Sequence, residues 1–182
     1  MTEQPLAYSR LLAFYRGTGT DHRGRTREEI VGWDNDRLER VHDFIQWLFP
    51  LDKPSPVNPS APVLTRSDRD TFQKEPALRE RLLDSFHRLL AFYGLERRAD
   101  AHACTIQKAP DWSVRSDVWL HPHNHNHLRI TRILKCLMLL GAREEAAAFY
   151  RVLNDVYASN DSTKITPVTM QYWTRAVSGD AG

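Results

Sequence analysis

Apolar residues recur along this chain at steps of three and four positions, the spacing that places them on one face of an α-helix. The clearest case runs from Asp36 to Phe49, where the pattern predicts a single helix that Pro50 ends. A second strong pattern predicts a helix over 128–140 that stops at Gly141. The same periodicity predicts a short helix around Phe72, longer helices over 76–93 and 143–157, and a last helix that begins at Thr166 and Pro167.

Two long connections separate these predicted helices. Residues 50–62 hold five of the ten prolines, and because proline fixes φ and lacks an N–H donor, an extended irregular loop is expected there. Residues 96–123 have weak periodicity, which indicates a connection anchored by Trp112 and Trp119. No alternation long enough for a buried strand is found. The pattern therefore predicts an all-α fold: a single compact domain over 1–182 with about six to eight helices, a proline-rich loop and a flexible tail at 178–182.

Composition and charge favour a soluble, cytoplasmic globular protein. Hydrophobic residues make up 41% and charged residues 26% of the chain, within the ordinary globular range. The net charge is only +2 and the basic residues are interspersed, so nucleic acid is not indicated. The longest apolar stretch is far short of the roughly 20 residues of a membrane helix, and no signal peptide is recognised. Cys104 and Cys136 lack CxxC spacing, which fits a reducing compartment.

Two segments are more specific than a generic helix. Residues 38–51 read LERVHDFIQWLFPL, here called the first motif, and residues 125–134 read HNHLRITRIL, here called the second motif. Between them lie APVLT at 61–65 and LAFYG at 90–94. Taken together, these segments resemble the conserved region of the opioid growth factor receptor family over roughly Trp33 to Tyr150.

The resemblance implies an all-helical, soluble domain unrelated to the seven-helix opioid receptors. The namesake of the family is a nucleus-associated receptor for an endogenous opioid peptide. This chain lacks the long, repeat-bearing C-terminal extension of the animal receptors, and its short connections and Phe14-Tyr15-Arg16-Gly17 segment are typical of a short, bacterial-type member.

The first candidate site is a pair of arginines, Arg129 and Arg132, in the first two turns of the predicted helix over 128–140. The helix macrodipole disfavours cations at this end unless a carboxylate or a bound anion offsets them. If an external anion does so, Arg129, Arg132, His125 and Asn126 form a carboxylate pocket. If an internal acid does so, the two motifs form a structural clasp. The candidate acids are Asp34, Asp36, Glu39 and Asp43.

The second candidate is the alternating run His121, His123, His125 and His127. An extended segment would place all four on one side, and a helix would pair them at four-residue steps, so metal binding is one interpretation. The segment has no acidic or cysteine ligand nearby in sequence. Neither a metal nor another cofactor is therefore expected.

The third candidate is His42, which lies between Glu39 and Gln46 at a spacing that places all three on one helical face. A general base held by a carboxylate is one interpretation, but no nucleophile lies beside it in sequence. Trp47 and Phe49 beside the proline loop suggest a peptide groove, although Trp47 is more simply explained as core with the loop across it.

Taken together, the sequence favours a ligand- or peptide-binding, receptor-like domain over an enzyme. Its ligand is expected to be a small anion or a peptide. Arg129 and Arg132 are the anchors, and His125, Asn126, His42, Gln46 and Trp47 shape the pocket. The alternative is a hydrolase-like enzyme, with or without metal, that uses His42 or the 121–127 segment. A structural interaction module comes third, and the oligomeric state is left open.

Overall fold

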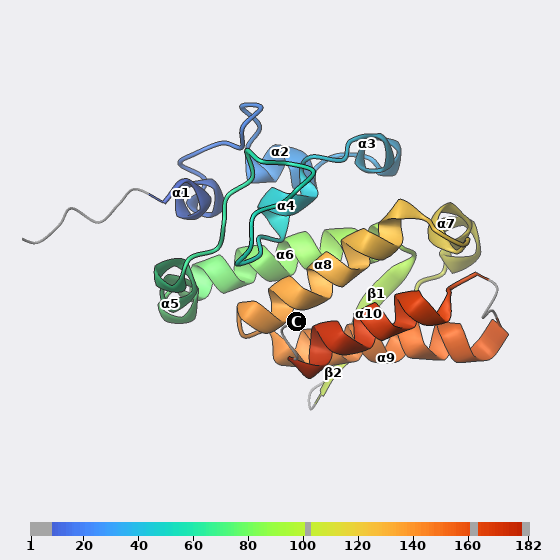
Figure 1. Cartoon of the computed structure of the whole chain (residues 1–182). Coiled ribbons are helices and arrows are strands. Elements are labelled where there is room, and N and C mark those ends of the chain that lie inside the picture. Colours follow the sequence, from blue (N-terminus) through green and yellow to red (C-terminus); the bar gives the residue numbers. More distant parts are fainter. Residues whose placement is uncertain (1–8, 101–102, 161–163, 180–182) are drawn as a thin grey trace, which may run out of the picture. The chain divides into compact units, whose positions relative to one another are not determined.

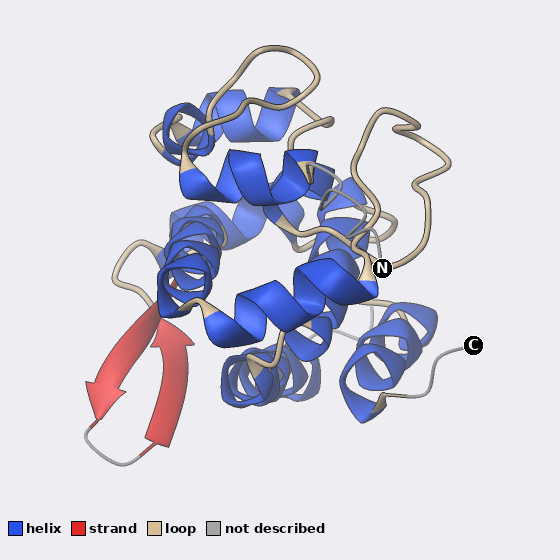
Figure 2. Ribbon diagram, turned by 90° about the vertical axis from the view of Figure 1, so that its left-hand side faces the viewer, coloured by secondary structure: helices blue, strands red, loops and turns tan. Residues whose placement is uncertain are grey.

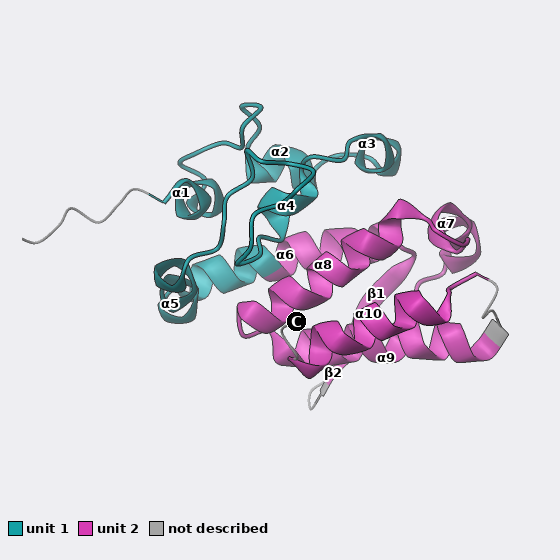
Figure 3. Cartoon of the chain, in the orientation of Figure 1, with its two compact units in different colours: residues 1–82 teal, residues 83–182 magenta. Residues whose placement is uncertain are grey.

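The computed structural model describes residues 9–100, 103–160 and 164–179, which form ten helices and one two-stranded sheet (Figure 1). Contacts within the chain divide it into two compact units, which meet in sequence between Leu82 and Leu83 (Figure 3). The mostly helical fold that the sequence predicted is confirmed, whereas the single domain over 1–182 stays a prediction. Of the expected tail, 180–182 lies outside the described residues.

Unit 1 contains five short helices and the first part of a long one. They are α1 (Arg10–Arg16), α2 (Arg27–Val31), α3 (Asn35–Arg40), α4 (Ile45–Leu48), α5 (Arg66–Lys74) and the start of α6 (Pro76–Phe92). Side-chain oxygens of Ser9, Thr26, Asp34 and Thr65 accept hydrogen bonds from first-turn N–H groups, which have no partner inside the helix. These caps stabilise α1, α2, α3 and α5, whereas α4 begins without a side-chain cap.

The predicted helix over Asp36–Phe49 is wrong, because the chain forms α3 and α4 with an extended Val41 (φ −95°, ψ 130°) between them. The side chain of Asp43, in the break, is held by cations of the 22–25 segment, and its carbonyl accepts a bond from Asn58. These bonds replace the contacts of a continuous helix. The apolar residues of both pieces are still buried, which is why their spacing looked like that of one helix.

The core of unit 1 is built from aromatic side chains of α1, α4 and α5. Phe14 meets Trp47 edge-on with 5.3 Å between ring centroids, and Tyr15 meets Phe72 at 4.9 Å. The Tyr15 hydroxyl donates to the Leu48 carbonyl. All four rings are at least 97% buried, so the first motif contributes Trp47 to the core.

Unit 2 contains the rest of α6 and six further elements. They are β1 (Leu95–Asp100), β2 (Ala103–Lys108), α7 (Trp112–Trp119), α8 (His125–Leu139), α9 (Arg143–Asn160) and α10 (Pro167–Ser178). Helices α8, α9 and α10 contact one another, and β2 packs on α9. The two strands are drawn in red in Figure 2. Tyr93 meets Trp119 with ring centroids 5.6 Å apart, and Trp119 and Trp173 are fully buried. The helices predicted over 76–93, 128–140 and 143–157 and after Pro167 are confirmed.

The antiparallel hairpin of β1 and β2 corrects the all-α prediction, which took 96–123 as a connection. Leu95 pairs with Lys108, and Arg97 pairs with Ile106. Cys104 and Ile106 are buried, but they give an alternation of only two apolar residues, and β1 carries mostly charged and small residues. The sequence signal was therefore too short to indicate strands. The anchoring role predicted for Trp119 in this region agrees with its burial.

Candidate functional site

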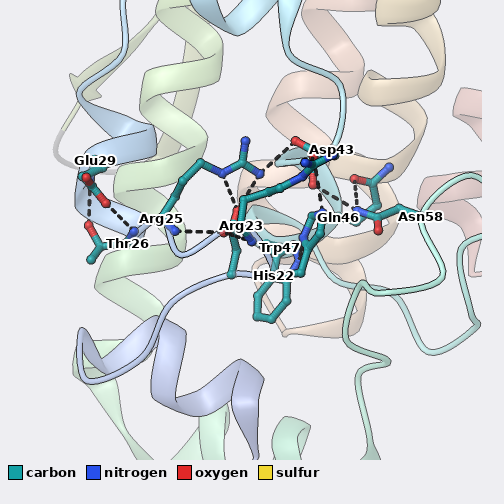
Figure 4. Close-up of polar contacts among 10 residues, drawn as sticks. His22, Arg23, Arg25, Thr26, Glu29, Asp43, Gln46, Trp47 and Asn58 are labelled. Atoms are coloured by element: carbon teal, nitrogen blue, oxygen red, sulfur yellow. Dashed lines mark hydrogen bonds and ion pairs between the residues drawn. The ribbon is translucent and has the colours of Figure 1, made fainter.

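The carboxylate of Asp43 is the centre of a polar cluster in unit 1 (Figure 4). Arg25 donates from Nη2 to Oδ1 at 2.8 Å, and Arg23 donates from Nε to Oδ2 at 3.2 Å. Nε2 of His22 lies 3.3 Å from Oδ2. Burial alone would raise the pKa of Asp43, but the bonds from Arg25 and the nearby charges hold it below its usual value. This acid of the first motif is therefore occupied within its own unit.

His22 links Asp43 to the aromatic core. The indole Nε1 of Trp47 donates to Nδ1 of His22 at 3.1 Å, and the two rings are nearly parallel, with 14° between their planes (Figure 4). An indole N–H can only donate, so Nδ1 must accept, and the ring proton of neutral His22 is placed on Nε2 toward Asp43. Trp47 is fully buried, in agreement with its interpretation as core.

The segment that supplies these partners is organised by Asp21. Its Oδ1 accepts from the backbone N–H groups of Arg23 and Arg25 at 2.8 and 3.0 Å, and its Oδ2 accepts from Nε of Arg25 at 2.7 Å. Arg25 is thus shared between two carboxylates. This segment is not among the sites predicted from sequence, although the run DHRGR at 21–25 concentrates charge around a glycine that adopts φ +78°.

The proline-rich loop is tied to the first motif through Asn58, whose side chain is buried. Its Nδ2 donates to the Asp43 carbonyl at 3.1 Å and lies 3.4 Å from Oε1 of Gln46 (Figure 4). Gln46 is itself 5% exposed. Of the residues expected to shape a pocket, Gln46 and Trp47 therefore help to build unit 1.

The helical face proposed for Glu39, His42 and Gln46 does not form. Glu39 lies in α3 and Gln46 in α4, and the extended Val41 between them removes the regular four-residue spacing. The predicted single helical face is therefore wrong, whereas the role of His42 stays a prediction. Asp34 instead caps α3 by accepting from the N–H of Arg37 at 2.7 Å.

The arginine pair of the second motif occupies the first two turns of α8, as predicted. Arg129 is 5% exposed and donates from Nη1 to Oδ1 of Asn126 at 3.1 Å. The first turn of α8 contains no acidic residue. The pKa of Arg132 is lowered because burial removes water from its guanidinium group, an effect that nearby Cys136 opposes.

The four alternating histidines differ in their surroundings. His121 and His123 precede α8 and are exposed, His125 is the first residue of α8, and His127 is buried. Neither the extended arrangement that would align all four nor the helical arrangement that would pair them at four-residue steps is formed. Among the described residues, no group of three His, Cys, Asp or Glu side chains is placed to hold a metal ion.

His127 is packed between two tryptophans. Its ring meets those of Trp119 and Trp173 edge-on at 6.3 and 5.6 Å, and its Nε2 lies 3.0 Å from the Trp119 carbonyl oxygen. Burial lowers the pKa of His127, and the other histidines of the segment lower it further, against the bond to Trp119. His127 is therefore a core residue held in its neutral form.

The structural clasp that the sequence offers as an alternative would join acidic residues of one unit to arginines of the other. Its acids, Asp34, Asp36, Glu39 and Asp43, belong to unit 1, whereas Arg129 and Arg132 belong to unit 2. Their juxtaposition stays a prediction.

Comparison with known proteins decides the family. The model of the family described as "Opioid growth factor receptor (OGFr) conserved region" matches residues 10–181. This chain belongs to that family. The match extends beyond the region of roughly Trp33 to Tyr150 on which the motifs lie, and it includes α1 and α10.

Curated relatives of the opioid growth factor receptor family agree with this assignment. The mouse opioid growth factor receptor is 36% identical over 154 residues, covering 82% of this chain and 24% of that protein. The human receptor is 40% identical over 127 residues, covering 68% of this chain and 18% of that protein. Mouse opioid growth factor receptor-like protein 1 is 31% identical over 150 residues, covering 80% of this chain and 32% of that protein.

The chain thus spans between 18% and 32% of the length of these relatives. No solved structure matches it. Within the ranges that the structure describes, no helix is both long enough and apolar enough to cross a membrane.

Proposed function

We propose that this chain is a receptor-like binding domain that holds the carboxylate of a peptide or another small anion on α8, with Arg129 and Arg132 as its anchors. The observation that carries the proposal is a buried Arg129 and a partly buried Arg132 near the start of a helix whose first turn has no acidic residue. We further propose that the domain acts in the cytoplasm.

The electrostatics of α8 favour an anion at this position. Desolvation of Arg132 disfavours its charged form, as its lowered pKa indicates. A carboxylate opposes this effect, and it matches the planar fork of donors that a guanidinium presents. His125 and Asn126 lie at the start of the same helix and complete the proposed site.

An exposed leucine adds an apolar contact beside the cations. Leu128 is 72% exposed and lies one turn before Arg132. A side chain four residues from another on a helix lies on the same face. The combination suits a peptide that presents a carboxylate next to an apolar side chain.

The names of the relatives support the same class of function. Relatives that match most of this chain are named receptors for an opioid growth factor. We extend ligand binding from them to this chain as a proposal. His42, Gln46 and Trp47 belong to unit 1, and the proposed site on α8 does not depend on them.

This function is tested by calorimetric titration with an opioid peptide. The peptide is compared in two forms, one with a free C-terminal carboxylate and one that is amidated. The free acid should bind saturably and the amide more weakly. Arg132→Gln should weaken binding roughly tenfold, the effect of one charge-assisted hydrogen bond. The control is Lys135→Gln, because Lys135 is an exposed cation on the same helix. Equal binding by the wild type and the Arg132→Gln variant, or no binding of either peptide form, would overturn the proposal.

A further inference from the structure

Unit 1 contains a groove that belongs neither to the Asp43 cluster nor to α8. Its volume is about 640 Å³, and its walls come from α1, from residues 62–65 and from α5. This volume is in the range of about 300–1,000 Å³ that is usual for small-ligand sites. The apolar part of the lining includes Leu12, Ala13, Pro62 and Val63.

The walls of the groove are fixed to each other at two points. The Ser9 hydroxyl donates to Oδ1 of Asp68 at 2.6 Å, which joins the start of α1 to α5. Arg16 and Glu75 form a two-point ion pair, with bonds of 2.5 and 3.2 Å, which joins the ends of the same helices. The groove is therefore preformed, which lowers the entropy cost of binding.

The charges in the lining differ in how far they are neutralised. Asp68 is buried and accepts bonds from Ser9 and Thr65, while Arg16 is bound to Glu75. Arg10 is exposed, and its guanidinium carbon lies 5.3 Å from the centroid of the Trp47 ring. Among the described residues, no carboxylate pairs with Arg10. The groove thus has one positive group available for an acidic partner.

We propose that this groove binds a short segment of a partner protein in which apolar side chains flank an acidic residue, with the acid bound by Arg10. A peptide fits the lining better than a lipid does, because hydroxyl groups of Thr18, Ser67 and Thr71 accompany the apolar residues. The Thr18 and Thr71 hydroxyls already donate to carbonyls within the chain, and their oxygens can accept from the N–H groups of a peptide backbone. Stacking on Trp47 holds the guanidinium of Arg10 in place.

The length of the bound segment follows from the helix that forms one wall. The seven residues of α1 extend about 10 Å at 1.5 Å per residue. An extended peptide covers that distance with about three to four residues. This second site lies wholly in unit 1 and does not depend on the proposed role of α8.

The test is an NMR titration of the ¹⁵N-labelled chain with the peptide acetyl-Leu-Glu-Leu-Leu-amide, its Phe- and Val-containing analogues, and a matched peptide with lysine in place of glutamate. The acidic peptides should shift amide signals of α1, residues 62–65 and α5. The lysine peptide should bind at least roughly tenfold more weakly, as expected for loss of a charge-assisted bond. No shift at millimolar peptide, shifts confined to unit 2, or equal binding of the lysine peptide would overturn the proposal.

Two groove variants and two control variants test where the acidic side chain of the peptide binds. Arg10→Gln removes the proposed anchor, and Val63→Glu places a negative charge in the lining where the side chain is 38% exposed and tolerant of change. Each should weaken binding of the acidic peptides roughly tenfold or more. Arg66→Gln and Val57→Glu change exposed residues outside the lining and should have no effect. Unchanged binding by both groove variants would contradict the proposal.

Discussion

The indole N–H of Trp47 donates to Nδ1 of His22 at 3.1 Å, and the other ring nitrogen of His22 lies 3.3 Å from Asp43. A fully buried core residue of the first motif is thereby connected to a half-buried carboxylate of the same motif. The connection runs through a residue that precedes both by about twenty positions. The first motif is therefore a structural centre of unit 1, where it fixes the 21–25 segment and the proline-rich loop.

Asp43→Asn should lower the free energy of unfolding at pH 7 by about 1–3 kcal/mol, because Arg25 and Arg23 lose their charged acceptor. Since the pKa of Asp43 is lowered on folding, its contribution is present above the unfolded value of about 3.9 and is lost as pH falls through the folded value. Urea unfolding at pH 7 and pH 3 measures both effects.

The control for that experiment is Asp36→Asn, because Asp36 is an exposed acid of the neighbouring helix α3. It should change stability by less than about 0.5 kcal/mol. If Asp43→Asn retains the full wild-type loss of stability between pH 7 and pH 3, Asp43 does not have the role assigned to it.

His127 should make the chain less stable in mild acid. Its pKa is lowered by burial, so the folded chain keeps it neutral while the unfolded chain takes up a proton below about pH 6.5. The free energy of unfolding should fall as pH drops from 7 to 5. His127→Gln should reduce that fall, whereas His42→Gln, at an exposed position in unit 1, should preserve it. His87 has a lowered pKa for a similar reason and accounts for part of the remaining dependence.

Gly94→Ala should destabilise the chain by more than about 2 kcal/mol. Gly94 has φ +76°, and an added Cβ would lie 2.7 Å from Cβ of Arg115 and 3.1 Å from Cα of Trp112. Gly141 has φ +80° with nothing within 4 Å, so Gly141→Ala should cost only the backbone term of about 1–2 kcal/mol. Thermal unfolding of the two variants compares their losses of stability directly. Equal losses would show that the close approach of α7 to Gly94 does not contribute to the cost of Gly94→Ala.

Much of the helical fold could be predicted from sequence because strong apolar periodicity coincides with clear end signals. Pro76 begins α6, Gly94 follows it, and Thr166 caps α10. The hairpin could not be predicted, since its apolar alternation covers only Cys104 and Ile106. The break between α3 and α4 could not be predicted either, because it depends on contacts of Asp43 with residues far from it in sequence.

Residues of the candidate site could be placed from sequence only where they lie on the same helix. Arg129 and Arg132 are one turn apart on α8, and that spacing fixes their positions in the helix. The partners of Asp43 could not be found in this way, because His22, Arg25 and Asn58 come from two loops that the fold brings together. Sequence spacing places residues within a helix but does not locate contacts between loops.

The central claim is that α8 binds an anionic ligand through its arginines, and a crystal structure of the chain with the free-acid opioid peptide tests it most directly. The account predicts the peptide carboxylate within hydrogen-bonding distance of the guanidinium of Arg132 or Arg129, with an apolar side chain against Leu128. A peptide bound elsewhere, with both guanidinium groups closed off by Asp34, Asp36, Glu39 or Asp43, would contradict the claim and make the two motifs a structural clasp.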